Sequence, residues 1–171
     1  MSSPSHADIL LIEDDPGDVL ITREALAASH VPTVLHVVHD GEQGMDFLAR
    51  RGAHASAVRP DLILLDLNLP RFDGRRVLEA AKSDPQTASI PVVVLTTSSA
   101  QHDVTECYAR GANAYLAKPL ELDGYLSAVR GVADFFLGAA RLPGRSSPRA
   151  ATCAPTVESD VSYVDGEETR S

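Results

Sequence analysis

Short apolar runs alternate with amphipathic stretches along most of the chain, and this alternation limits the fold more than any other feature. Apolar runs of about four to seven residues, without regular polar alternation, are typical of strands buried on both faces of a parallel sheet. Five runs can be recognised: Ile9–Ile12, 34–38, Leu62–Leu65, Val92–Leu95 and Tyr115–Ala117. Because each run precedes a segment with helical spacing, the sequence predicts a doubly wound α/β fold with a five-stranded parallel sheet.

Helical spacing also indicates which side chains of the helices face inward. After the first run, the spacing predicts a buried stripe made of Val19, Leu20, Arg23, Leu26 and Ala27. After the fourth run, we expect Val104, Cys107 and Tyr108 to face the core. The apolar repeat after the fifth run extends from Leu122 to Phe136, so the last helix is expected to be the longest.

Length and composition set the limits on domains and partners. With 171 residues, the chain can form one domain with a substantial core. We expect a tail over residues 1–7, the domain over 8–143 and a disordered tail over 144–171, which is poor in apolar side chains. Acidic residues outnumber basic ones by 24 to 15, and the net charge of −9 disfavours nucleic-acid binding. No membrane span, leader or disulfide framework is expected, which favours a cytoplasmic protein.

Reactive polar side chains occur where the apolar runs end. They are Glu13, Asp14, Asp66, Thr96 and Lys118, and Tyr115 belongs to the short run that Lys118 follows. Ligands of open α/β sheets bind outside the carboxyl ends of the strands, so these positions predict one shared site. Taken singly, Asp66 could be a turn former, Glu13 and Asp14 could cap the first helix, and Lys118 could be a solvated surface residue. The coincidence of four strand-end placements favours the site.

The residue types indicate the chemistry of this site. Three converging carboxylates repel one another unless a cation neutralises them, and Mg²⁺ prefers carboxylate, carbonyl and water oxygens. A carboxylate beside such a cation can act as a nucleophile on a phosphoryl group. Lys118 would then neutralise charge on the phosphoryl oxygens, and the Thr96 hydroxyl would donate a hydrogen bond to one of them.

At these residues the chain resembles the receiver domain of two-component response regulators, the CheY-like family. Ile12–Asp14 is similar to the acidic pair of that family, 65–70 with Asp73-Gly74 to its phosphoacceptor segment, and Ala117–Pro119 to its lysine-proline motif. Spacing supports Thr96 rather than Thr97 as its switch hydroxyl. The resemblance covers roughly residues 8–132 and implies the flavodoxin-like (βα)5 fold with strand order 2-1-3-4-5.

The resemblance also implies a role for each matching residue. Asp66 would accept a phosphoryl group from the phosphohistidine of a sensor histidine kinase. Asp14 would bind Mg²⁺ directly, Glu13 through water, and the backbone carbonyl of Asn68 would be a further ligand. Glu13 departs from the commoner aspartate of the family, and its longer side chain is expected to alter the metal geometry.

A switch is implied as well. In receivers of this kind Tyr115 would turn inward as Thr96 moves toward the phosphoryl group, which would change the face formed by the fourth helix, fifth strand and fifth helix. The family pattern further implies a cis bond at Lys118-Pro119. The chain is therefore expected to be a phosphoacceptor signalling protein and not an enzyme.

The last helix resembles a narrower group. Ala133–Phe136 with Arg141–Pro143 is similar to the C-terminal helix of small receivers paired with bacterial and cyanobacterial phytochrome kinases. This implies a phytochrome-type kinase partner and a possible homodimer. Three alternatives remain open: a pseudo-receiver that acts by binding alone, a phosphate sink, and an aspartyl-phosphate hydrolase. The hydrolase is weakly supported, because Asn68 stands where a second acid would protonate a leaving group.

Overall fold

The computed structural model of the protein describes residues 6–143. Its elements alternate strictly: β1 (Ala7–Ile12), α1 (Pro16–Ala27), β2 (Thr33–Val38), α2 (Gly41–Ala49), a 3₁₀ turn (Gly52–His54), β3 (Leu62–Leu65), α3 (Gly74–Ser83), β4 (Val92–Thr96), α4 (Gln101–Ala109), β5 (Ala114–Ala117) and α5 (Leu122–Ala133). A π-helical stretch, Asp134–Ala139, continues α5. The expected C-terminal tail lies outside the described residues, and Ala7 already belongs to β1.

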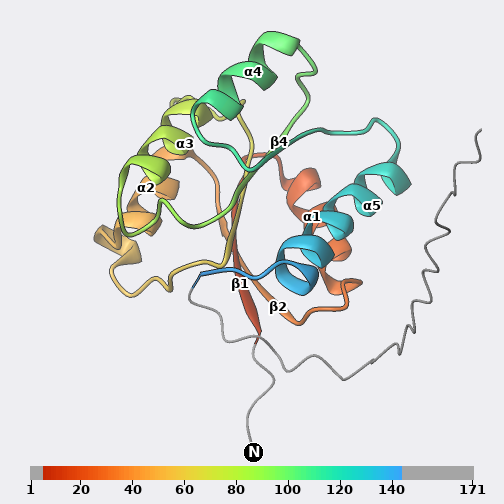
Figure 1. The fold of residues 1–171 in the computed structure, drawn as a ribbon, viewed down its shortest axis with the longest axis horizontal. Coiled ribbons are helices and arrows are strands. Elements are labelled where there is room, and N and C mark those ends of the chain that lie inside the picture. The colour runs from red at the N-terminus through yellow and green to blue at the C-terminus, as the bar shows by residue number, and fades with distance from the viewer. Residues whose placement is uncertain (1–5, 144–171) are drawn as a thin grey trace, which may run out of the picture.

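The strands form one parallel sheet in the order β2-β1-β3-β4-β5, which confirms the predicted fold class and strand order. Helices cover both faces. Figure 1 shows α2, α3 and α4 on one side of the sheet and α1 with α5 on the other. Within residues 6–143, no helix combines the length and the apolar character that crossing a bilayer requires.

Two apolar cores lie on the two faces, because neighbouring residues of a strand point in opposite directions. In β3, Ile63 and Leu65 pack under α2, α3 and α4, whereas Leu62 and Leu64 pack under α1 and α5. All four side chains of β3 are at most 1% exposed. This double burial explains the continuous apolar runs in the sequence.

Two predictions of helix orientation are partly wrong. The buried residues of α1 are Thr22, Ala25 and Leu26, whereas Leu20 is 56% exposed and Arg23 lies at the surface. The stripe is displaced because small Thr22, not Arg23, fits beneath α5. In α4, Cys107 is fully buried as expected, but Tyr108 is 50% exposed because it follows Cys107 by one residue, away from the sheet.

Candidate functional site

The parallel register brings the predicted site residues together at one edge of the sheet. The Asp66 amide donates to the Ile12 carbonyl at 3.1 Å, so the residue after β3 lies beside the end of β1. The Lys118 amide donates to the Thr96 carbonyl at 2.7 Å, which places the residue after β5 beside the end of β4. The side chain of Lys118 then crosses to the segment after β1. The structure thus brings these strand ends together at one edge of the sheet.

Lys118 is the centre of the site. Its Nζ lies 2.7 Å from Glu13 Oε2, 2.8 Å from Asp66 Oδ2 and 2.7 Å from Asp18 Oδ2. An ammonium group has three N–H donors, so these three carboxylates use all of them. Burial lowers the pKa of Lys118, but the hydrogen bonds to Asp18, Asp66 and Glu13 outweigh this effect and raise the pKa above its ordinary value. Lys118 is therefore a permanent cation in this arrangement.

Glu13 is the most deeply buried carboxylate of the site, with a side chain only 2% exposed. Burial raises its pKa to about 7, although hydrogen bonds from Lys118 and from the Asp15 amide act in the opposite direction. The Asp15 amide donates to Glu13 Oε1 at 3.0 Å, and Asp15 itself caps α1 by accepting from the amides of Gly17 and Asp18. The N-terminus of α1 is therefore capped by Asp15. The alternative that Glu13 and Asp14 serve only as helix caps does not describe Glu13, whose side chain bonds Lys118.

Asp66 is held from two sides in the loop after β3. Its Oδ1 accepts from the Asn68 amide at 3.0 Å, while its Oδ2 contacts Lys118. The Asn68 side-chain amide donates to the hydroxyl oxygens of Thr96 at 3.2 Å and Thr97 at 3.3 Å. Gly74 closes the loop: a Cβ there would lie 2.4 Å from the Asp66 carbonyl oxygen, so only glycine permits this approach.

The acidic side chains fit a divalent cation. Glu13, Asp14 and Asp66 each offer an oxygen, and these oxygens lie within 4.8 Å of one another. Glu13 and Asp66 are buried, whereas Asp14 is exposed, so the group opens toward solvent. An all-oxygen donor set of this kind suits a hard cation such as Mg²⁺. The Asn68 backbone carbonyl stays a prediction.

Thr96 and Tyr115 lie next to the loop between β4 and α4. Thr96 is fully buried, and its hydroxyl oxygen is also 3.4 Å from the Ser98 amide. The Tyr115 hydroxyl donates to the Ser98 carbonyl at 2.9 Å, which ties the partly buried ring to this loop. All peptide bonds of residues 6–143 are trans, so the expected cis bond at Lys118-Pro119 is wrong. The trans form is the intrinsically preferred one even before proline.

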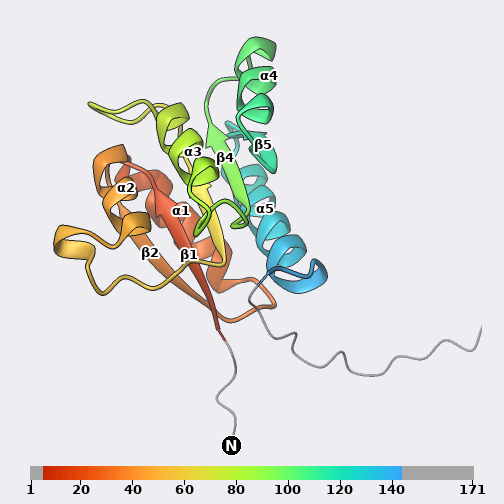
Figure 2. The same cartoon turned by 60° about the vertical axis from the view of Figure 1, so that its left-hand side comes forward.

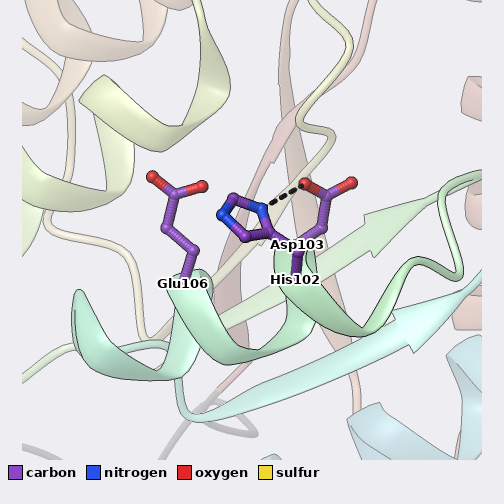
Figure 3. Close-up of side chains that lie close together, drawn as sticks. All are labelled: His102, Asp103 and Glu106. Atoms are coloured by element: carbon purple, nitrogen blue, oxygen red, sulfur yellow. Dashed lines mark ion pairs between the residues drawn. The ribbon is translucent and has the colours of Figure 1, made fainter.

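A second acidic cluster lies on α4, where Figure 3 shows His102, Asp103 and Glu106 side by side. His102 is 86% exposed and lies 3.8 Å from Asp103. Arg75 bonds both carboxylates, Arg110 bonds Glu106 at 2.8 Å, and the Ser98 hydroxyl donates to Asp103. These hydrogen bonds lower the pKa values of Asp103 and Glu106. The cluster is thus a salt-bridge network between α3 and α4.

Two parts of this arrangement were not predicted. One is the Ser98–Asp103–Arg75 network, which no local sequence signal indicates. The other is Asp18, which completes the coordination of Lys118. Asp18 lies in the first turn of a helix that begins just after β1, so its position in the sequence already placed it near the same edge of the sheet. An acidic residue in that turn was a usable signal.

Comparisons with known proteins agree with this geometry. Residues 9–130 match the family model of the response regulator receiver domain. The chain is 42% identical over 135 residues to response regulator Rcp1 of Synechocystis sp., covering 79% of this chain and 92% of that protein.

Two solved structures are similar in fold as well as in sequence. The phosphorylated cyanobacterial phytochrome response regulator RcpA aligns with a TM-score of 0.79 and 45% identity, over 81% of this chain and 99% of RcpA. The Mn²⁺-bound form of Rcp1 aligns with a TM-score of 0.77 and 42% identity, over 80% and 99% of the two chains. Because the family model and these relatives match most of the chain, and because the fold is the same, the chain belongs to the response regulator receiver domain family.

Proposed function

We propose that Asp66 accepts a phosphoryl group from a phosphohistidine, with Mg²⁺ bound by Glu13, Asp14, Asp66 and the Asn68 backbone carbonyl. In this transfer the P–N bond to the histidine breaks and a P–O bond to an Asp66 carboxylate oxygen forms. The cation would offset the charge of the carboxylates and of the incoming phosphoryl oxygens. The observation that carries the proposal is the contact of buried Asp66 with the permanent cation Lys118, beside the candidate metal ligands.

Thr96 and Tyr115 would couple phosphorylation of Asp66 to a change at the protein surface. The Asn68 side chain links the phosphoacceptor loop to the Thr96 hydroxyl, and the Thr96 hydroxyl neighbours the Ser98 amide. Tyr115 bonds the carbonyl of the same Ser98. A phosphoryl group that attracts the Thr96 hydroxyl would therefore disturb the loop on which Tyr115 depends. The face of α4, β5 and α5 then changes and binds or releases a partner, and a second copy of this chain is one such partner.

The test is intact mass after incubation with acetyl phosphate. We expect one phosphoryl adduct in wild type that requires Mg²⁺, and none in Asp66→Asn, which replaces the nucleophilic oxygen by an amide. Circular dichroism verifies that the variant is folded. Equal adducts in both proteins would contradict the assignment, and a wild type that takes up neither phosphoryl groups nor beryllofluoride would favour a binding module without phosphorylation.

We propose that the kinase partner is of the phytochrome type and that this chain acts in the cytoplasm. The support is the similarity to RcpA, which is named a phytochrome response regulator. Transfer from several autophosphorylated histidine kinases should be compared at short reaction times. We expect phytochrome-type kinases to transfer their label fastest, and faster transfer from kinases that lack this sensor would contradict the partner assignment while leaving Asp66 as the acceptor.

A further inference from the structure

Asp18 stands apart from the other carboxylates on Lys118. Glu13 and Asp66 belong to the group whose oxygens lie within 4.8 Å of one another, together with Asp14, whereas Asp18 is not a member of that group. Asp18 is also the most accessible of the three partners, with a side chain 26% exposed against 2% for Glu13 and 7% for Asp66. It comes from α1 and not from a strand end.

The donors of Lys118 are all in use. Its three N–H groups are matched by three carboxylate oxygens at 2.7, 2.7 and 2.8 Å. A phosphoryl oxygen that is to be bound by Lys118 must therefore replace one of these partners or share a donor with it. Glu13 and Asp66 are fixed by burial, and a cation at the site would hold them further. The exchangeable partner is the exposed one.

We infer that Asp18 is a positioning residue that competes with the phosphoryl group for Lys118. This inference rests on the proposed function. In the unmodified protein Asp18 helps to hold the Lys118 ammonium beside Glu13 and Asp66. On modification of Asp66 the ammonium turns from Asp18 to a phosphoryl oxygen. Asp18 thereby opposes occupancy of the site in two ways. It retains the lysine, and its negative charge repels the incoming anion.

The effect is measurable with beryllofluoride, which mimics the phosphoryl group on the aspartate. Asp18→Asn removes the charge and keeps the size of the side chain. We expect the beryllofluoride dissociation constant to fall about two- to fivefold, the scale of one partly exposed ion pair. The initial rate of phosphorylation by acetyl phosphate should rise by a similar factor. Both are measured at saturating Mg²⁺, because the lost charge also weakens attraction for the cation.

Two further variants separate charge from structure. Asp18→Glu keeps the charge and should stay close to wild type. Glu24→Gln removes the same charge from an exposed position of the same helix, away from the partners of Lys118, and should not change the dissociation constant. Thermal unfolding of each variant establishes that the fold persists. A structural role of Asp18 alone would change the melting temperature but would not tighten beryllofluoride binding.

Failure of this inference differs from failure of the proposed function. A wild type that binds no beryllofluoride and takes up no phosphoryl group overturns the proposed function itself. A wild type that does both, with Asp18→Asn equal to it or weaker, overturns only the competition. Asp18→Asn that binds more tightly, together with unchanged Glu24→Gln, supports it.

Discussion

At the residue scale, charge balance determines what the site can bind. One ammonium group, Lys118, faces Glu13, Asp18 and Asp66, and exposed Asp14 is a fourth carboxylate nearby. The residue types after β1, β3 and β5 predicted that Glu13, Asp14, Asp66 and Lys118 would lie together, but not that Asp18 would join them. The sequence predicted that Lys118 would bind phosphoryl oxygens. It did not predict that Lys118 forms ion pairs with the carboxylates of the site. The remaining negative charge still favours a divalent cation, and a Mn²⁺-bound form of the relative Rcp1 has been solved.

Glu13 gives a prediction for the metal-free protein. Burial raises its pKa to about 7, so the folded state binds the Glu13 proton more tightly than the unfolded chain does. Stability from this group is complete below its ordinary pKa of 4.5 and is lost as the pH rises through about 7. We expect the free energy of unfolding to fall by roughly 1–3 kcal/mol across this interval. Urea unfolding in the presence of a chelator, at a series of pH values, measures it.

The control for this experiment is Glu13→Gln, which cannot titrate at that position. Its free energy of unfolding should lose the part of the slope that belongs to Glu13 and should otherwise follow wild type. Identical slopes in the two proteins would show that another group titrates in this interval and would contradict the assignment to Glu13.

At the scale of elements, two arginines join α3 and α4, and they differ in the carboxylates that they bond. Arg75 bonds Asp73, Asp103 and Glu106, and Asp103 also accepts from the Ser98 hydroxyl in the loop between β4 and α4. Arg110 links Glu79 and Glu106 and does not contact Asp103. Through Asp103, Arg75 therefore restrains the loop between β4 and α4, whose Ser98 carbonyl accepts from the Tyr115 hydroxyl. Arg110 only joins the two helices.

This difference predicts unequal effects of two similar substitutions. Arg75→Met should raise amide hydrogen exchange across residues 97–104 about fivefold, because a partly exposed ion-pair network contributes about 1 kcal/mol. Arg110→Met, the matched control, should leave exchange in that segment unchanged. Hydrogen–deuterium exchange with mass spectrometry measures both. Equal protection of the segment in the two variants would mean that Arg75 does not restrain the loop.

The strands were the most predictable elements, and the helix faces were less so. The predicted run Leu62–Leu65 coincides with β3, because a strand buried on both faces leaves a continuous apolar sequence. In α1 apolar residues surround much of the helix, so periodicity alone did not reveal that Thr22 faces inward. The orientation depends on packing between the sheet and α5, and a local pattern contains no information about that contact.

At the scale of the whole molecule, the site is a product of sheet topology. Glu13 and Lys118 are 105 positions apart in the sequence. They meet because parallel strands end at the same edge of the sheet. The sequence therefore predicted the strand-end residues. It did not predict the Ser98–Asp103–Arg75 network, because those contacts join a loop and two helices whose relative placement is fixed only by the folded core.

The outer face of α4, β5 and α5 gives the last prediction. Figure 2 shows these three elements along one side of the molecule, and β5 is an edge strand of the sheet. Tyr108 in α4 and Leu122 at the start of α5 are 50% and 54% exposed. Exposed apolar side chains beside an edge strand favour association, and the proposed switch changes this face when Asp66 is modified. We therefore expect beryllofluoride with Mg²⁺ to shift wild type from monomer toward dimer.

Sedimentation velocity measures this shift, and Leu122→Asp should reduce it by placing a charge in the contact. An acidic residue in the first turn of α5 is compatible with the helix dipole, so the variant should remain folded. Val58→Asp, which alters an exposed apolar residue in the loop before β3, is the matched control and should dimerise like wild type. A wild type that stays monomeric while it binds beryllofluoride would contradict self-association. Its switched face would then have to act on a different protein.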